Sequence, residues 1–146
     1  LMGRIRVSAT FAAPPDRVWA EVEQLERHVR WMADAESIHF TSASHRGVGT
    51  TFDCITRVGP IRLTDRMEIV RWDPGRRIGV RHVGVVTGTG ELTLRRARRG
   101  RTRFTWDERL TYPGWLGGRI GGLVGDRILR RIWKGNLRRL GALVEP

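Results

Sequence analysis

The chain has almost no cysteine, because Cys54 is the single one among 146 residues. One thiol excludes an intrachain disulfide and favours a reducing compartment. Long apolar segments are missing too, since no run approaches the ~20 residues of a membrane-spanning helix, and no secretory signal pattern opens the sequence. We therefore expect a soluble, cytoplasmic protein.

Signatures of metal, cofactor and nucleophile sites are also lacking. His28, His39 and His45 are scattered without the spacing of metal ligands. The glycines of residues 84–90 do not open a helix, so they do not form a dinucleotide loop. Cys54 has no catalytic context in the sequence and is expected in the core. We predict no metal and no cofactor.

Lysine is nearly absent, although the chain is strongly basic. Of 27 basic residues only Lys134 is a lysine, and the formal net charge is +12. The densest basic run, residues 95–103, falls where a hairpin turn is expected, and it is either a solvated turn or a patch for anionic lipid or nucleic acid. No helix-turn-helix, zinc-finger or RNA-recognition signature accompanies it, which argues against a nucleic-acid-binding module.

What is present predicts one folded domain over residues 1–146, with 40% hydrophobic residues and six tryptophans. Residues 4–11 alternate, with Ile5 and Val7 facing one way and charged or polar residues the other, as in a half-buried strand. Pro15 and Asp16 then open a helix. A second short helix is expected over residues 26–32.

From residue 37 to residue 112 the apolar and polar residues follow the two-residue period of β-strands. Strands are predicted at residues 37–42, 48–58, 61–72, 78–83, 88–96 and 101–111. The connections are short, so neighbouring strands should pair antiparallel as a meander. With the C-terminal helix the order is β-α-α-β6-α, and we predict an α+β fold in which a curved antiparallel sheet of about seven strands surrounds that helix.

The C-terminal helix has an unusual first half. From Asp126 onward, apolar residues including Ile128, Trp133 and Leu140 share one side and arginines the other. When the same helical periodicity is extended toward the N-terminus, the core-facing side holds Gly118, Gly121, Gly122 and Gly125. The outward side then holds Leu116, Ile120, Leu123 and Val124. Glycines on the core-facing side would leave room for a ligand; alternatively, the helix breaks near Gly125.

Three ionisable residues fall on otherwise apolar strand faces. Alternation puts Asp65, His82 and Glu108 on the inner side of three different strands. A buried carboxylate or imidazole is usually paired or functional. If the three meet in a cavity, a carboxylate of raised pKa beside a neutral histidine suits general acid–base work. Alternatively, each pairs with a nearby arginine such as Arg57, Arg66 or Arg109, or lies in water at a strand end.

Several stretches, taken in this order, resemble the SRPBCC superfamily, whose START-like helix-grip fold includes polyketide cyclase/dehydrase-type proteins. They are APPDRVWAEV at residues 13–22, the Trp31-Met32 pair, GVGTTF at 47–52, EIVRWDPGRRI at 68–78 and GRTRFTWDERL at 100–110. The resemblance implies a hydrophobic cavity between the sheet and the C-terminal helix. Together with strand alternation, it gives the expected ligand-cavity residues Trp31, Phe52, Cys54, Leu63, Met67, Val80, Leu92, Trp106, Tyr112, Gly118, Gly122 and Gly125. Trp31 and Tyr112 are expected near the entrance.

The resemblance does not fix an activity, because one fold carries many functions. The first hypothesis is a protein that binds an apolar small molecule (a polyketide, lipid or aromatic metabolite), with or without cyclase/dehydratase-type catalysis by Asp65, His82 and Glu108. The second is a peripheral lipid carrier that uses the basic surface and the outward residues of the C-terminal helix on anionic membranes. The same outward residues also suit a homodimer contact.

Overall fold

The strands of this chain form one antiparallel sheet. The computed structural model describes the backbone of residues 2–114 and 118–146, and within those ranges the sheet has seven strands. These are β1 (Met2–Phe11), β2 (Ala35–Phe40), β3 (Thr51–Val58), β4 (Ile61–Asp73), β5 (Arg77–Val83), β6 (Thr87–Arg96) and β7 (Thr102–Thr111). The helical elements are α1 (Pro15–Val22), η1 (Leu25–Arg30), η2 (Arg98–Gly100) and α2 (Gly118–Val144). The predicted α+β fold is confirmed.

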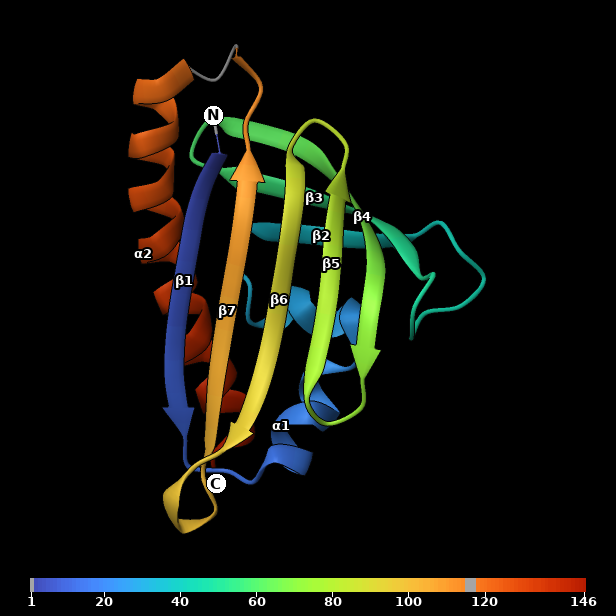
Figure 1. Ribbon diagram of the computed structural model, residues 1–146, viewed down its shortest axis with the longest axis vertical. Coiled ribbons are helices and arrows are strands. Elements are labelled where there is room, and N and C mark those ends of the chain that lie inside the picture. The colour runs from blue at the N-terminus through green and yellow to red at the C-terminus, as the bar shows by residue number, and fades with distance from the viewer. Residues whose placement is uncertain (1, 115–117) are drawn as a thin grey trace.

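The strand order is β1-β7-β6-β5-β4-β3-β2. From β2 to β7 each strand pairs with the next along the chain, as the short turns predicted. β1 adds to the far side of β7 over its whole length, from Met2 opposite Thr111 to Phe11 opposite Thr102. The first and last strands are therefore neighbours, as Figure 1 shows.

The sheet is sharply bent. In Figure 1, β2 and β3 cross behind the upright strands β5, β6 and β7. β4 joins the two parts, and its pairing with β5 shifts register between Ile69 and Arg71, while β2 shifts between Ala35 and Ser37 against β3. An extra residue in one strand bends it and increases its twist, so these bulges curl the sheet into a half-closed trough.

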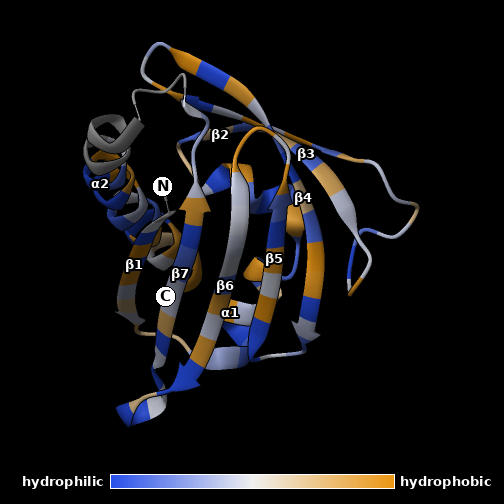
Figure 2. Ribbon diagram, turned by 45° about the horizontal axis from the view of Figure 1, so that its top comes forward, coloured by the Kyte–Doolittle hydropathy of each residue, from blue (hydrophilic) through white to orange (hydrophobic). Residues whose placement is uncertain are grey.

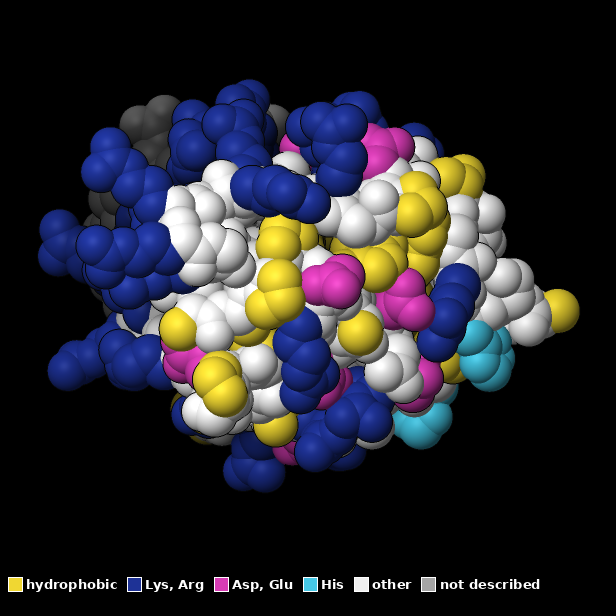
Figure 3. Space-filling view, turned by 90° about the horizontal axis from the view of Figure 1, so that it is seen from below, with side chains coloured by type: hydrophobic (Ala, Val, Ile, Leu, Met, Phe, Trp, Pro, Cys, Tyr) yellow, Lys and Arg dark blue, Asp and Glu magenta, His cyan; other side chains and the backbone are white. Residues whose placement is uncertain are grey.

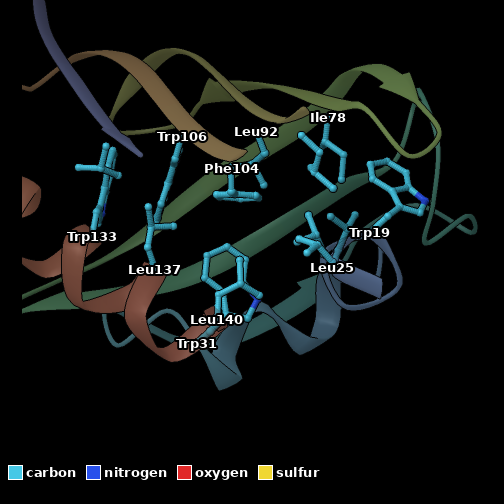
Figure 4. Close-up of a cluster of buried hydrophobic side chains, with 14 of the residues drawn as sticks. Trp19, Leu25, Trp31, Ile78, Leu92, Phe104, Trp106, Trp133, Leu137 and Leu140 are labelled. Atoms are coloured by element: carbon cyan, nitrogen blue, oxygen red, sulfur yellow. The ribbon is translucent and has the colours of Figure 1, made fainter. Parts of the chain in front are cut away.

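The concave side of the trough is covered by η1 and α2. Trp31 is fully buried between Phe104 and Trp106, with both rings edge-on to it. Trp106 stacks flat on Trp133 of α2, with ring centroids 4.1 Å apart. Leu137 continues this layer along α2, as Figure 4 shows. These aromatic contacts attach the helix to the sheet near its middle.

The C-terminal helix is continuous from Gly118 to Val144, so the alternative of a break near Gly125 is excluded. Trp133 and Leu140 face the sheet as expected. Ile128 does not, because 45% of it is exposed where the helix passes the open end of the trough. Residues 115–117 lie outside the described residues, as do the side chains of residues 118–124, so the expected positions of Leu116, Ile120, Leu123 and Val124 stay predictions.

Several boundaries also differ from the prediction; β2, for example, spans Ala35–Phe40 and not residues 37–42. The second short helix is a 3-10 helix that ends at Arg30. β3 begins at Thr51 and not at residue 48, because Gly47 and Gly49 take positive φ angles of 84° and 94° in the turn that precedes the strand. Among the described helices none is both long and apolar enough to cross a membrane.

Candidate functional site

Asp65, His82 and Glu108 form one hydrogen-bonded row on the concave face. His82 Nδ1 lies 3.0 Å from both carboxylate oxygens of Asp65, and His82 Nε2 lies 2.6 Å from Glu108 Oε1. The three residues come from β4, β5 and β7. His82 and Glu108 are each 5% exposed, so the row is almost dry.

The row crosses β6, and that strand makes room for it. His82 is opposite Gly88 of β6, and Glu108 is opposite Gly90. A Cβ atom on Gly90 would collide with the Glu108 carboxylate, and one on Gly88 would collide with the carbonyl oxygen of Arg109. Gly90 therefore leaves the space that the Glu108 carboxylate occupies, so that the side chains of β5 and β7 meet across an intervening strand.

The charge of the row follows from its geometry. Burial by itself lowers the pKa of His82, but the charge of Glu108 and the hydrogen bonds to Asp65 and Glu108 outweigh it and raise the pKa to about 10. His82 is thus an imidazolium at neutral pH, with each N–H donating to a carboxylate. This corrects the expectation of a neutral histidine.

Glu108 is the member of the row with a free oxygen. Burial raises the pKa of its carboxyl, and the neighbouring His82 charge opposes that rise in part. Oε1 accepts from His82, whereas Oε2 has no hydrogen-bond partner among the described residues. Glu108 can therefore hold or release a proton toward whatever lies beside Oε2.

Two of the arginines considered as alternative partners for this row, Arg57 and Arg66, pair with other carboxylates. Arg66 binds Asp53 at 3.2 Å, and Arg57 lies 3.7 Å from Glu36. Both pairs lie on the exposed side of the sheet. Asp65 and Glu108 instead share His82, and the strand-end alternative is excluded by their burial.

A small cavity adjoins the row. This inner cavity has a volume of about 90 Å³ and lies between the sheet, η1 and α2. Glu108 and His82 line it on the sheet side, and His28 lines it from η1. Its lining includes Phe52, Cys54, Met67, Val80, Leu92 and Trp106, all of which were expected to line a ligand cavity.

A larger, apolar cavity follows toward the open end of the trough. This outer cavity has a volume of about 320 Å³ and is bounded by the β3–β4 turn, the end of β7 and the first described turns of α2. Leu63, Tyr112 and Gly125 line it. A Cβ on Gly125 would meet no atom of the described residues within 4 Å, which agrees with a glycine that leaves space. Gly118 and Gly122 lie among residues whose surroundings are not described.

Trp31 was expected at the entrance and is not there. It is 0% exposed, and the described linings of the two cavities do not include it. Its ring fills the centre of the core, because η1 turns inward at that point and presents it to Phe104 and Trp106. Tyr112 does lie at the outer cavity, where its hydroxyl donates to Asp126 Oδ1 at 3.1 Å.

Asp34, Thr56 and Trp133 line both cavities and so form the boundary between them. Trp133 Nε1 donates to Asp34 at 3.2 Å, and the fully buried Asn136 donates to it at 2.9 Å. Neither Asp34 nor Asn136 was predicted to be a site residue. A polar residue on the apolar face of the C-terminal helix was the available signal for Asn136.

Neither a reactive thiolate nor a metal site is evident among the described residues. Burial raises the pKa of the Cys54 thiol to about 12, so it is protonated at neutral pH. Among the described residues, no three His, Cys, Asp or Glu side chains converge as a metal site would require. A groove of about 420 Å³ between β1 and α2 contains none of Asp65, His82 and Glu108.

Comparison with known proteins agrees with this architecture. The sequence profile of a family described as "Polyketide cyclase / dehydrase and lipid transport" matches residues 2–145. Comparison with curated protein sequences finds no match.

Solved structures are similar in fold at low sequence identity. TTHA0849 from Thermus thermophilus is 20% identical, with a TM-score of 0.78 and 97% of each chain covered. The Zhui aromatase/cyclase from a Streptomyces species is 17% identical, with a TM-score of 0.79, covering 99% of this chain and 94% of its own.

Proposed function

Because this chain belongs to the polyketide cyclase/dehydrase and lipid transport family, we propose that it binds an apolar small molecule in the two cavities between the sheet and α2. A polyketide, a lipid or an aromatic metabolite has the required character. We propose further that Asp65, His82 and Glu108 supply acid–base chemistry of the cyclase/dehydratase type. In line with the single, buried thiol, we propose that the protein works in the cytoplasm.

One observation carries this proposal: a buried imidazole bridged by two carboxylates lies at the closed end of an apolar cavity. Burying these charges is costly, and a well-packed apolar core would be at least as stable. Perturbed titratable groups beside a cavity are typical of functional sites. An elongated ligand would fill the outer cavity and bring one polar end to Glu108.

The arrangement suits loss of water from a β-hydroxy ketone. The Glu108 carboxylate takes the proton from the carbon next to the ketone, and the electron pair forms the new C=C bond as the hydroxyl group leaves. The same proton then passes from Glu108 to the departing hydroxyl, which gives one water molecule. The His82 charge, held in place by Asp65, keeps Glu108 ionised for the first step.

The proposal is tested by native mass spectrometry and turnover assays with aromatic polyketides and lipids. We expect one ligand per chain for the wild type. Asp65→Asn, His82→Ala and Glu108→Gln should each lower turnover by about 10²-fold or more and leave binding mostly intact. Asp107→Asn is the matched control, because Asp107 lies beside Glu108 in β7 but points outward to Arg4.

Two results would count against this function. Absence of any bound ligand across these compound classes would remove the binding role. Full activity in all three variants would remove the acid–base role and leave carriage of the ligand.

A second candidate function, lipid carriage at a membrane, is favoured by the rim of the outer cavity. Ile61, Val83, Val85 and Ile128 are 42–48% exposed and come from three separate elements around the open end. The apolar turn between β5 and β6 is visible in Figure 2. Arg62 and Arg127 adjoin Ile61 and Ile128 in sequence and are exposed. Exposed aliphatic residues flanked by arginine suit an anionic membrane surface.

The basic turn between β6 and β7 does not belong to that rim. It lies at the opposite end of the molecule from the β3–β4 and β5–β6 turns (Figure 1). Seen from the end that carries it, Lys and Arg side chains gather toward one side (Figure 3). A flat membrane that contacts the rim therefore cannot contact residues 95–103 at the same time.

Sedimentation with vesicles separates the two candidates. If the protein is a membrane carrier, Ile61→Asp combined with Ile128→Asp should lower sedimentation with anionic vesicles at least fivefold, because both side chains would enter the membrane. Val48→Asp is the matched control, since Val48 is 66% exposed and lies in the β2–β3 loop away from the rim. Equal and negligible sedimentation with anionic and neutral vesicles would remove this candidate.

A further inference from the structure

A second imidazole, that of His28, lines the inner cavity from the helical side. His28 belongs to η1 and is 6% exposed. Its ring packs against Trp31, with centroids 4.9 Å apart, so it is held in one place. The inner cavity therefore has an ionisable side chain on each of two walls, with Glu108 and His82 on the sheet and His28 on η1.

The hydrogen bonds of His28 define which nitrogen carries the proton. Nε2 lies 2.7 Å from the carbonyl oxygen of Val22, and a carbonyl can only accept, so Nε2 is the N–H. Burial lowers the pKa of His28, opposed in part by the Val22 carbonyl and by Glu26 and Glu21, which keeps the ring neutral. Nδ1 is then unprotonated and can accept a hydrogen bond, and it has no hydrogen-bond partner among the described residues.

The two walls are thus chemically different. The sheet wall carries an imidazolium and carboxylates, whereas the helical wall offers a neutral acceptor. Figure 4 shows Leu25 of the helical wall opposite Leu92 and Trp106 of the sheet wall. A ligand without an O–H that displaced water from this acceptor would leave it without a donor, so a ligand that supplies an O–H is favoured over one that does not.

We propose that His28 Nδ1 accepts a hydrogen bond from a hydroxyl group at the inner end of the ligand. This inference rests on the proposed function. The ligand class is then an apolar molecule with a phenol or enol hydroxyl. A carboxylate in that place is disfavoured, because Asp34 and Glu108 line the same small cavity and an anion there would face like charge.

A purely structural role for His28 uses the other nitrogen. Through Nε2 the ring caps the carbonyl of Val22, the last residue of α1, and this role needs nothing from Nδ1. The two roles are therefore separable by a measurement that reports on Nδ1 alone.

The test uses 2-naphthol and 2-methylnaphthalene, which have nearly the same shape and differ in one hydroxyl group. Long-range ¹H–¹⁵N spectra of histidine-labelled protein should show the neutral Nε2–H tautomer for His28. We expect the Nδ1 resonance to shift on addition of 2-naphthol and to stay in place with 2-methylnaphthalene. The wild type should bind 2-naphthol about fivefold more tightly, as one net hydrogen bond predicts.

His28→Leu should abolish this preference, so that the ratio of the two dissociation constants falls to about one, while binding of 2-methylnaphthalene changes little. His39→Leu is the matched control, because His39 is an exposed histidine outside the linings of both cavities, and it should leave the Nδ1 shift and the ratio in place. The ratio and the Nδ1 shift are insensitive to a general loss of stability in a variant.

Two outcomes overturn the inference in different ways. If both probes bind and the Nδ1 resonance stays unchanged with 2-naphthol, His28 has only its structural role, while the proposed function stands. If neither probe nor any other apolar compound binds, the proposed function fails, and the inference fails with it.

Discussion

At the scale of single residues, His82 determines the electrostatics of the candidate site. It is buried, and it is nevertheless charged, because carboxylates lie against both of its ring nitrogens. Either carboxylate alone would leave one N–H without an acceptor in a dry environment. The row therefore works as a unit, and we expect changes at its three members to be far from additive.

The raised pKa of His82 predicts a defined pH dependence. Its folded-state pKa of about 10 lies above the ordinary value of 6.5, so its contribution to stability is fully present below about pH 6.5 and is lost as the pH rises toward 10. We expect the ¹⁵N resonances of His82 to stay those of an imidazolium up to at least about pH 9. Titration with a midpoint near 6.5 would contradict the arrangement.

Gly90 is predicted to be a positioning residue for Glu108. Gly90→Ala should push the carboxylate away from His82, lower the His82 pKa and destabilise the protein by about 1–3 kcal/mol. Urea unfolding and histidine NMR measure the two effects. In a Glu108→Ala background the space is free, so the same Gly90→Ala change should cost much less. Equal costs in both backgrounds would show that Gly90 acts independently of Glu108.

At the scale of elements, α2 closes the trough and divides its interior. Asn136 accepts from the backbone N–H of Ala33 and donates to Asp34, which joins the helix to the chain just before β2. Trp133 adds a bond to the same carboxylate. This junction lies between the inner cavity and the outer one.

The helix position Gly125 gives a direct test of the outer cavity. Gly125→Ala should raise the free energy of unfolding by about 0.5–1 kcal/mol, because alanine favours the helix and its Cβ meets no atom. Gly125→Leu should keep the fold but lower the affinity for 2-methylnaphthalene at least tenfold, because its side chain would enter the cavity. Thermal unfolding and titration calorimetry measure these effects. Unchanged affinity in Gly125→Leu would mean that the ligand lies elsewhere.

At the scale of the whole molecule, the charge and the cavity are separate features. The net charge of +12 comes from arginines spread over the surface, whereas the outer cavity is lined almost entirely by apolar residues. Long-range electrostatics therefore bears on association with anionic surfaces and not on the affinity for an uncharged ligand.

This separation predicts two different salt dependences. Binding of 2-methylnaphthalene should change less than about twofold between roughly 20 mM and 500 mM NaCl, while any sedimentation with anionic vesicles should fall about tenfold or more, because surface charges are screened over that range. Both are measured on the wild type. A strongly salt-dependent affinity for the uncharged probe would mean that arginines reach the cavity.

Much of the fold could be predicted from the order of residues because it depends on local patterns. Alternation assigned Glu108 to the inner side of the last strand, and it is buried there together with Phe104 and Trp106. Turn chemistry predicted the antiparallel meander. Local patterns could not reveal the 3-10 character of η1 or the exposure of Ile128, since both depend on what packs against them.

The sequence by itself determined which side chains face inward, because a strand has a period of two and a helix one of 3.6. Only the tertiary structure decided that β1 lies beside β7 and that Asp65, His82 and Glu108 meet, across separations of 17 and 26 residues. Such contacts depend on strand register, on two bulges and on the space left at Gly90. The physical reason is that register and bulges are set by packing across the whole sheet, which no short stretch of sequence contains.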